Sequence, residues 1–280
     1  MNKIRQVVDV IEPRFVMEGA GVRLQRSIAP QPSNHFDPFL LFDHFAFNDP
    51  IEGPIRGFPM HPHRGIETVT YMLTGSVNHR DSLGNAGLIG PGDVQWMTAG
   101  GGIMHEEMPR RGPDGSIHGF QLWVNLPASQ KMSAPRYQEV AAATIPVVEG
   151  KGHRVRVVAG MVGNTSGPVT EIAARPLYLE VTMDAKAEFV QSIPAGHTTL
   201  AYVFEGQGKF GDTGLEAIKL VVFSDGDNLQ VETGDLPVRF MLMAGAPIKE
   251  PIVPYGPFVM NTIEEIQQAL LDLRNGTFVK

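Results

Sequence analysis

The sequence of 280 residues contains no cysteine, which excludes disulfide bonds, thiolate nucleophiles and cysteine metal ligands at once. Any metal must therefore be held by His, Asp or Glu. Long hydrophobic runs are also absent. No stretch of about 18 apolar residues predicts a transmembrane helix, and residues 1–13 lack the apolar segment of a signal peptide. We therefore expect a cytoplasmic protein that makes no contact with a membrane.

Positive charge is scarce in this chain. Lys and Arg total 23 against 30 Asp and Glu, which gives a formal net charge of −7, and no run of basic residues offsets it. Because such a protein repels phosphate groups, we do not expect direct binding to nucleic acid. The 42% of hydrophobic and 19% of charged residues are typical of a globular protein with a packed core, which excludes a disordered chain.

The main pattern in the sequence is a series of short segments with the composition of β-strands. The 31 glycines and 22 prolines divide the chain into short segments. Residues 67–73, 177–182 and 200–204 are rich in β-branched and aromatic side chains and are bounded by turn signals that contain glycine. Many such strands at a spacing of about ten residues predict an all-β sandwich or barrel.

One helix is expected, at the carboxyl end of the chain. Thr262 and Glu265 have the spacing of a capping box, and Gly276 stands where a helix would stop. Between them, apolar residues recur at helical spacing and predict one buried stripe: Ile263, Ile266, Ala269, Leu270 and Leu273.

The two halves of the sequence resemble each other. Residues 70–75 and 201–206 each read as a strand that runs into a glycine turn, and Gly-Asp pairs follow at 92–93 and 226–227. A repeat of this length predicts a duplicated β-domain. The strand pattern lapses between Pro127 and Pro146, so we place the boundary there. We expect an N-terminal domain at residues 1–135 and a C-terminal domain, with the helix, at residues 136–280.

Histidines are concentrated in the first half, which holds seven of the nine. His61 and His63 are two residues apart, and residues i and i+2 of a strand point to the same face. His105 and Glu107 form a second pair with this spacing. If the two strands face each other, three imidazoles and one carboxylate converge. This donor set suits Fe, Mn, Ni, Cu or Zn and suits Mg or Ca poorly.

Other readings of these residues stay open. One His-x-His pair also occurs in histidines that lie at the surface or at strand ends. Two carboxylates compete with Glu107 as the acidic ligand, namely Glu67 and the adjacent Glu106. On a strand Glu106 points away from His105, so solvent exposure is the better reading of that side chain.

The second repeat serves as an internal comparison. Superposing the two strand-and-glycine segments puts Ser192 and Pro194 at the positions of His61 and His63. Superposing the two Gly-Asp pairs puts Arg239 and Met241 at the positions of His105 and Glu107. His153 and His197 are the remaining histidines of this half, and each is isolated. We therefore expect metal in the first domain alone.

Several ordered segments of the first half resemble the pirin family of the cupin superfamily. They are DPFLLFD at 37–43, GFPMHPHRGIE at 57–67, PGDVQWMTAG at 91–100, GIMHEEMP at 102–109 and QLWVNLP at 121–127. The resemblance implies a bicupin, in which two antiparallel β-barrel (jelly-roll) domains lie face to face. It also implies one divalent transition metal on His61, His63, His105 and Glu107, with Fe(II) preferred and Mn, Ni, Cu, Co or Zn as alternatives.

The same resemblance implies an oxidoreductase of the flavonol (quercetin) 2,3-dioxygenase type, which acts on a small aromatic substrate and O₂. Glu107 would then serve as ligand and general base. Four side chains beside the ligands are candidates for the substrate pocket, although they read equally well as core: Phe58, Met60, Met104 and Trp123. Arg64 should point away from the metal into a structural ion pair.

Two alternative functions remain. Some pirins are regulatory proteins, so the chain could instead respond to the redox state of its metal and bind a transcription factor or a metabolic enzyme without turnover. The cupin site could also act on an unrelated small substrate, because the sequence alone does not define the pocket.

Overall fold

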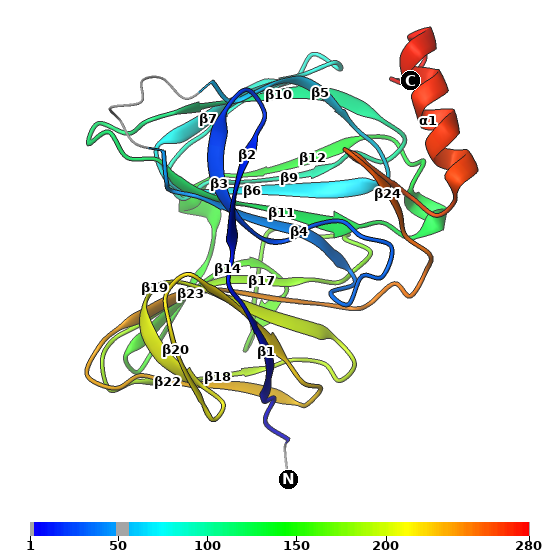
Figure 1. Ribbon diagram of the computed structural model, residues 1–280. Coiled ribbons are helices and arrows are strands. Elements are labelled where there is room, and N and C mark those ends of the chain that lie inside the picture. The colour runs from blue at the N-terminus through cyan, green and yellow to red at the C-terminus, as the bar shows by residue number, and fades with distance from the viewer. Residues whose placement is uncertain (1–2, 49–55, 280) are drawn as a thin grey trace. The chain divides into compact units, whose positions relative to one another are not determined.

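The computed structural model describes residues 3–48 and 56–279 (Figure 1). The chain separates into two compact units, and each is built from two non-contiguous segments. The N-terminal unit comprises Arg14–Ala142 with Ile248–Lys280, and the C-terminal unit comprises Met1–Pro13 with Ala143–Pro247. Strands dominate both units, and every strand ladder in the described residues is antiparallel, so the predicted all-β class is confirmed.

The N-terminal unit contains two main sheets. One has seven strands in the order β12-β9-β6-β11-β4-β3-β2, and the other has four in the order β5-β10-β7-β8. Among the described residues no ladder joins these sheets, so the unit is a jelly-roll sandwich rather than a closed barrel. The strands are β2 (Arg14–Glu18), β3 (Val22–Ile28), β4 (Phe39–Phe45), β5 (Phe58–His63), β6 (Ile66–Thr74), β7 (Ser76–Asp81), β8 (Ala86–Ile89), β9 (Val94–Thr98), β10 (Ile103–Arg110), β11 (His118–Asn125) and β12 (Arg136–Val140).

The C-terminal unit is built around a ten-stranded sheet, which includes a strand from the start of the chain. Its strands are β1 (Val7–Ile11), β13 (Val147–Gly150), β14 (His153–Ala159), β17 (Leu177–Met183), β18 (Glu188–Ser192), β19 (Thr198–Phe210), β20 (Thr213–Glu216), β21 (Lys219–Phe223), β22 (Asn228–Glu232) and β23 (Val238–Gly245). The short strands β15 (Met161–Val162) and β16 (Thr165–Ser166) form a separate hairpin. Buried apolar side chains from these strands fill the interior of the unit, including Phe189, Val203, Phe210, Val231 and Phe240.

The predicted duplication is visible in the two central strands. Gly75 follows β6 and Gly206 lies within β19, and both have a positive φ, 72° and 75°. A side chain at Gly75 would also come within 2.6 Å of the carbonyl oxygen of Arg110, and one at Gly206 would meet the carbonyl group of Pro237. Glycine is therefore required at the same place in both copies.

The ends of the chain are exchanged between the units, so the predicted division at residues 135 and 136 is wrong in its outer parts. Strand β1 pairs with β21 of the C-terminal unit. The last segment, with β24 (Val253–Tyr255), β25 (Phe258–Met260) and helix α1 (Ile263–Asn275), belongs to the N-terminal unit. A single domain boundary cannot describe this arrangement, because the exchanged segments contact residues that lie more than a hundred residues away in the sequence.

Helix α1 begins and ends as predicted. Thr262 accepts a hydrogen bond from the Glu265 backbone N–H in a complete capping box, and Gly276 closes the helix in the left-handed conformation. The predicted stripe is only partly buried, since Ile266 and Ala269 are buried whereas Ile263 and Leu273 are exposed. No helix in the described residues is long and apolar enough to span a membrane.

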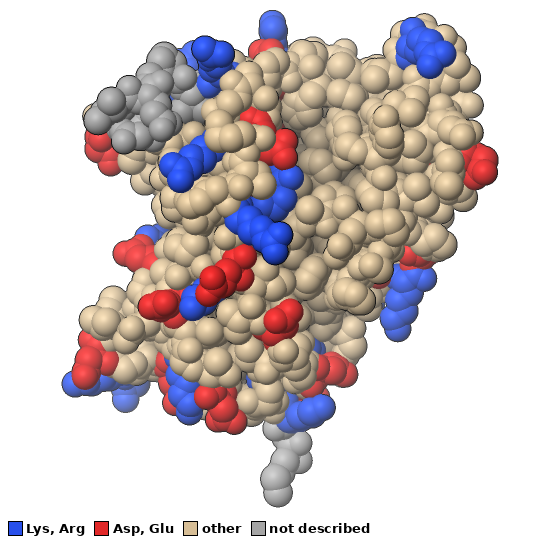
Figure 2. Space-filling view, viewed as in Figure 1, with Lys and Arg blue, Asp and Glu red and all other residues tan. Residues whose placement is uncertain are grey.

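Charged side chains of both signs are interspersed on the face shown in Figure 2, and basic side chains form no extended patch there. This agrees with the net charge of −7.

Candidate metal centre

The histidine cluster is built by strands β5 and β10 of the N-terminal unit. They pair antiparallel in a register that sets His61 opposite His105. His63 shares a strand face with His61, because side chains on one face recur every two residues. The structure thus brings together the three histidines that the sequence selected, and their ligand atoms all lie within 4.8 Å of one another.

The hydrogen bonds of these rings leave free nitrogens that converge. The Nδ1 atoms of His61 and His63 face the carbonyl oxygens of Pro59 (2.9 Å) and Pro257 (3.4 Å), which can only accept. With the proton of each neutral ring on Nδ1, both Nε2 atoms present a lone pair, and they lie 3.0 Å apart. Both ring nitrogens of His105 are buried without a partner. A bound metal ion would satisfy all of these unused lone pairs, so the residues fit a metal site.

The electrostatic environment keeps the imidazoles of His63 and His105 neutral. Burial, reinforced by His105 and His61, lowers the pKa of His63 well below its ordinary value. Burial, reinforced by His61 and His79, lowers the pKa of His105 to about 3. Neutral imidazole is the form that binds metal, so near neutral pH protons do not compete for these two nitrogens.

Glu107 lies on β10 beyond His105 and lines the cavity described below, but it is outside the group of three histidines. The register between β10 and β5 shifts after His105, so Glu107 pairs with Phe58. Its buried carboxyl group accepts a hydrogen bond of 2.9 Å from the hydroxyl of Thr70, and burial raises its pKa. The tight group of donor atoms consists of the histidines, and ligation by Glu107 therefore stays a prediction.

The two competing carboxylates have other roles. Glu67 is buried and accepts a hydrogen bond of 2.7 Å from Thr98 on the neighbouring strand, and burial raises its pKa to about 7. Glu106 lies next to Glu107 but pairs with Arg80 at 2.6 Å. Neither of them is among the described residues that line the cavity beside the histidines.

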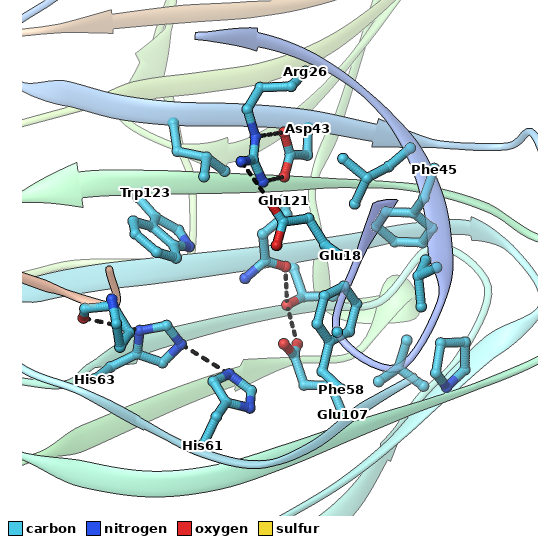
Figure 3. Close-up of a pocket in the computed structure, with 18 of the residues that line it drawn as sticks. Glu18, Arg26, Asp43, Phe45, Phe58, His61, His63, Glu107, Gln121 and Trp123 are labelled. Atoms are coloured by element: carbon cyan, nitrogen blue, oxygen red, sulfur yellow. Dashed lines mark hydrogen bonds and ion pairs between the residues drawn. The ribbon is translucent and has the colours of Figure 1, made fainter. Parts of the chain in front are cut away.

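A cavity of about 390 Å³ opens beside the histidines (Figure 3). Phe58 and Trp123 are among its lining residues, and the Trp123 ring meets the His63 ring edge to face at 5.1 Å between centroids. The predicted pocket residues Met60 and Met104 do not line it, and those two assignments are wrong. Each methionine is adjacent to an inward-facing histidine, so the alternation of the strand turns it outward. Met60 is 42% exposed, and Met104 packs toward Phe258 and helix α1.

Arg64 is placed as predicted. It follows His63 but points away from the cluster, and its guanidinium group bonds the Asp272 carboxylate of helix α1 at 2.7 Å. It also lies over the ring of Phe278 at 4.3 Å. The residue after the ligand pair therefore ties the C-terminal helix to the strand that carries the ligands.

Sequence reasoning missed the polar side chains on the opposite wall of the cavity, namely Glu18, Arg26, Asp43, Thr70 and Gln121. One signal was present for Gln121, since it is two residues from Trp123 and shares its strand face. Arg26 and Asp43 are 17 residues apart and meet only through the register of β3 and β4.

The corresponding strand pair of the C-terminal unit is β18 and β22. It holds Phe189 opposite Val231 and Gln191 opposite Leu229, so most of its interior is apolar. The predicted equivalence of Arg239 with His105 is wrong, because Arg239 lies on the next strand, β23, where it pairs with Glu180. The two Gly-Asp pairs are not equivalent, since one precedes β9 and the other precedes β22.

Comparisons with known proteins agree with this architecture. The family model described as "Pirin" matches residues 21–124, and the "Pirin C-terminal cupin domain" model matches residues 178–279. A "Pirin-like protein" of Caulobacter vibrioides is 42% identical over 277 residues, which cover 98% of this chain and 99% of that protein. "Pirin" of Homo sapiens is 44% identical, with 98% and 94% covered. A crystal structure of quercetin 2,3-dioxygenase from Acinetobacter baumannii superposes with a TM-score of 0.88 at 34% identity and covers 98% of both chains.

Proposed function

The chain belongs to the pirin family of two-cupin proteins, and from this premise we propose that it is a metal-dependent dioxygenase of the flavonol 2,3-dioxygenase type. One observation carries the proposal: three imidazoles with unused nitrogens converge at the wall of a largely apolar cavity that can hold a small aromatic molecule. The similarity to the Acinetobacter baumannii quercetin 2,3-dioxygenase structure supports it.

We assign the metal to His61, His63 and His105, with Glu107 as the fourth ligand, and Fe(II) as the ion. When bound, such an ion supplies Lewis acidity, which lowers the pKa of a flavonol hydroxyl, and the redox chemistry that O₂ requires. The remaining tasks fall to side chains of the protein.

Glu107 takes the proton of the flavonol hydroxyl in this proposal. Thr70 holds one oxygen of the carboxyl group, which leaves the other oxygen to ligate the metal and to accept the proton in turn. Burial raises the pKa of this carboxyl group, which makes it a stronger base than an exposed glutamate. Trp123 and Phe58 present aromatic surfaces to a flat substrate and exclude water from the reacting edge.

The alternative function, regulation through a protein partner without turnover, predicts a different outcome in one assay. Protein loaded with iron under anaerobic conditions is given quercetin and O₂, and carbon monoxide is measured, since cleavage of the flavonol ring releases it. Release above that of the metal-free protein supports the enzyme. Release equal to that control favours the regulatory alternative.

A further inference from the structure

A row of polar residues crosses the cavity face of the seven-stranded sheet. On β3, β4, β11 and β6, four adjacent strands, cross-strand pairing aligns Arg26 with Asp43, Asp43 with Gln121, and Gln121 with Thr70. All four residues line the cavity. The row therefore begins at Arg26 and reaches Thr70, whose hydroxyl bonds the candidate base Glu107.

The end of the row remote from Glu107 is a rigid ionic group. Arg26 donates from Nε and Nη2 to the two oxygens of Asp43, at 2.8 and 2.7 Å, and from Nη1 to Glu18 at 2.7 Å (Figure 3). The Asp43 side chain is only 5% exposed. A buried ion pair is weak evidence for a role in stability, because apolar residues of similar size stabilise a fold equally well. The surrounding wall is indeed apolar, with Val22, Leu24, Leu41 and Phe45.

The charges of this group determine which ligands it can accept. Two carboxylates, Glu18 and Asp43, face one guanidinium, so the group carries no excess positive charge. Burial raises the pKa of Asp43 to about 6, against the opposing effect of Arg26, and its carboxylate is therefore mostly ionised at neutral pH. A carboxylate or phosphate on a ligand would be repelled here. A neutral hydroxyl donor would be accepted, because each carboxylate oxygen that binds Arg26 still has a free lone pair.

The spacing of the strands gives the reach of a suitable ligand. Neighbouring strands lie about 4.8 Å apart, so Asp43 on β4 is about 10 Å from Thr70 on β6 along the sheet. Gln121 lies between them, with its side-chain oxygen 2.8 Å from the Thr70 hydroxyl. A molecule of linked aromatic rings spans such a distance, whereas a small organic acid does not.

We propose that Asp43, oriented by Arg26, and Gln121 form a second recognition site of the cavity, which binds hydroxyl groups on the pendant ring of a neutral polyphenol. Asp43 lies at the end of the cavity row remote from Glu107 and Gln121 lies in its middle, and the site selects hydroxylated over unsubstituted rings. The inference rests on the proposed function, because the opposite edge of the polyphenol is held at the histidine cluster.

The test measures binding rather than turnover. Quercetin carries two hydroxyls on its pendant ring, and galangin has the same ring frame and metal-facing edge without those two hydroxyls. Dissociation constants of both are measured anaerobically, by titration calorimetry, for protein loaded with zinc, which has no redox chemistry. We expect quercetin to bind about tenfold more tightly, the effect of one hydrogen bond to a charged group. In Asp43→Asn and Gln121→Met this ratio of dissociation constants should fall toward one, while the zinc content, which depends on the histidines, stays unchanged.

A matched control is Glu180→Gln, which alters a buried carboxylate paired with Arg239 in the C-terminal unit and should keep the tenfold ratio. Equal binding of the two flavonols to the unaltered protein, or a ratio preserved in both variants, overturns the second site alone. Absence of binding by either flavonol overturns the proposed function with it. If Asp43→Asn does not fold, the ratio of quercetin to galangin affinity in the unaltered protein and in Gln121→Met still tests the second site.

Discussion

The Nε2 atoms of His61 and His63 lie 3.0 Å apart, although the Nδ1 atoms of both rings face carbonyl oxygens. Two lone pairs at this distance repel each other unless a cation or a proton lies between them. Burial opposes the proton at His63, because it lowers the pKa of that ring. The geometry of this one pair therefore favours a metal ion, and the unpartnered nitrogens of His105 supply a further donor.

We predict that His61→Ala removes most of the bound metal. Loss of a residue that only supports a ligand typically weakens metal affinity by about 10–100-fold, so loss of a ligand should exceed that range. His197→Ala, in the C-terminal unit, should retain the metal, because His197 belongs to no cluster of possible ligands in the described residues. Metal content after dialysis against a weak chelator is the measurement. Equal loss from the two variants would show that the cluster does not bind the metal.

Glu107→Gln should reduce flavonol turnover more than it reduces metal content. The histidines remain in this variant, whereas removal of a general base typically slows a reaction by about 10²–10⁴-fold. Metal content and the rate of quercetin consumption are measured on the same preparation. Glu106→Gln is the control, because the adjacent carboxylate pairs with Arg80 outside the cavity. If Glu107→Gln turns over quercetin at the unaltered rate, Glu107 is not the base.

The alternation of side chains along a strand explains which residues of this site could be predicted from the sequence and which could not. His61 and His63 are two residues apart, and the prediction that they share one strand face is correct. By the same rule Met60, next to His61, points outward, although its apolar side chain had suggested a place in the pocket. The polar row on the cavity face of the seven-stranded sheet could not be predicted from the sequence, for another reason. Arg26 and Asp43 meet through the register of two strands, and nothing in the local sequence specifies that register.

The helix shows the same limit. Thr262, Glu265 and Gly276 define its ends through contacts within a few residues, and these were predicted correctly. Its partner in the fold, Arg64, lies 208 residues away from Asp272. Local signals therefore identified the element, and only the structure identified the unit to which it belongs.

We predict that Asp272→Asn loosens helix α1. The change leaves the Arg64 guanidinium, only 1% exposed, without a charged partner on the helix. Breaking a buried ion pair in this way costs about 3 kcal/mol, and we expect about 2 kcal/mol because Asp272 is 14% exposed. Amide hydrogen exchange within Ile263–Asn275 should accelerate about 30-fold. Glu264→Gln, at the start of the helix, is the control and should change the rate of amide exchange by about fivefold at most. Unchanged exchange in Asp272→Asn would mean that apolar contacts alone hold the helix.

The buried carboxyl group of Glu67 should make stability depend on pH. Its pKa is raised by burial from 4.5 to about 7. Between these values the folded protein binds more protons than the unfolded chain, so the contribution of Glu67 to stability is present below pH 4.5 and is lost as the pH rises through 7. Glu67→Gln cannot ionise and should therefore gain stability relative to the unaltered protein over this window, by at most about 3 kcal/mol.

The measurement is the free energy of unfolding of both proteins in denaturant at pH 5 and at pH 8. The difference in the free energy of unfolding between the two proteins is compared at the two pH values. Contributions from the histidines are common to both proteins and cancel in this difference. A constant difference for Glu67→Gln would show that Glu67 is ionised in the fold, and that its bond to Thr98 offsets the cost of burial.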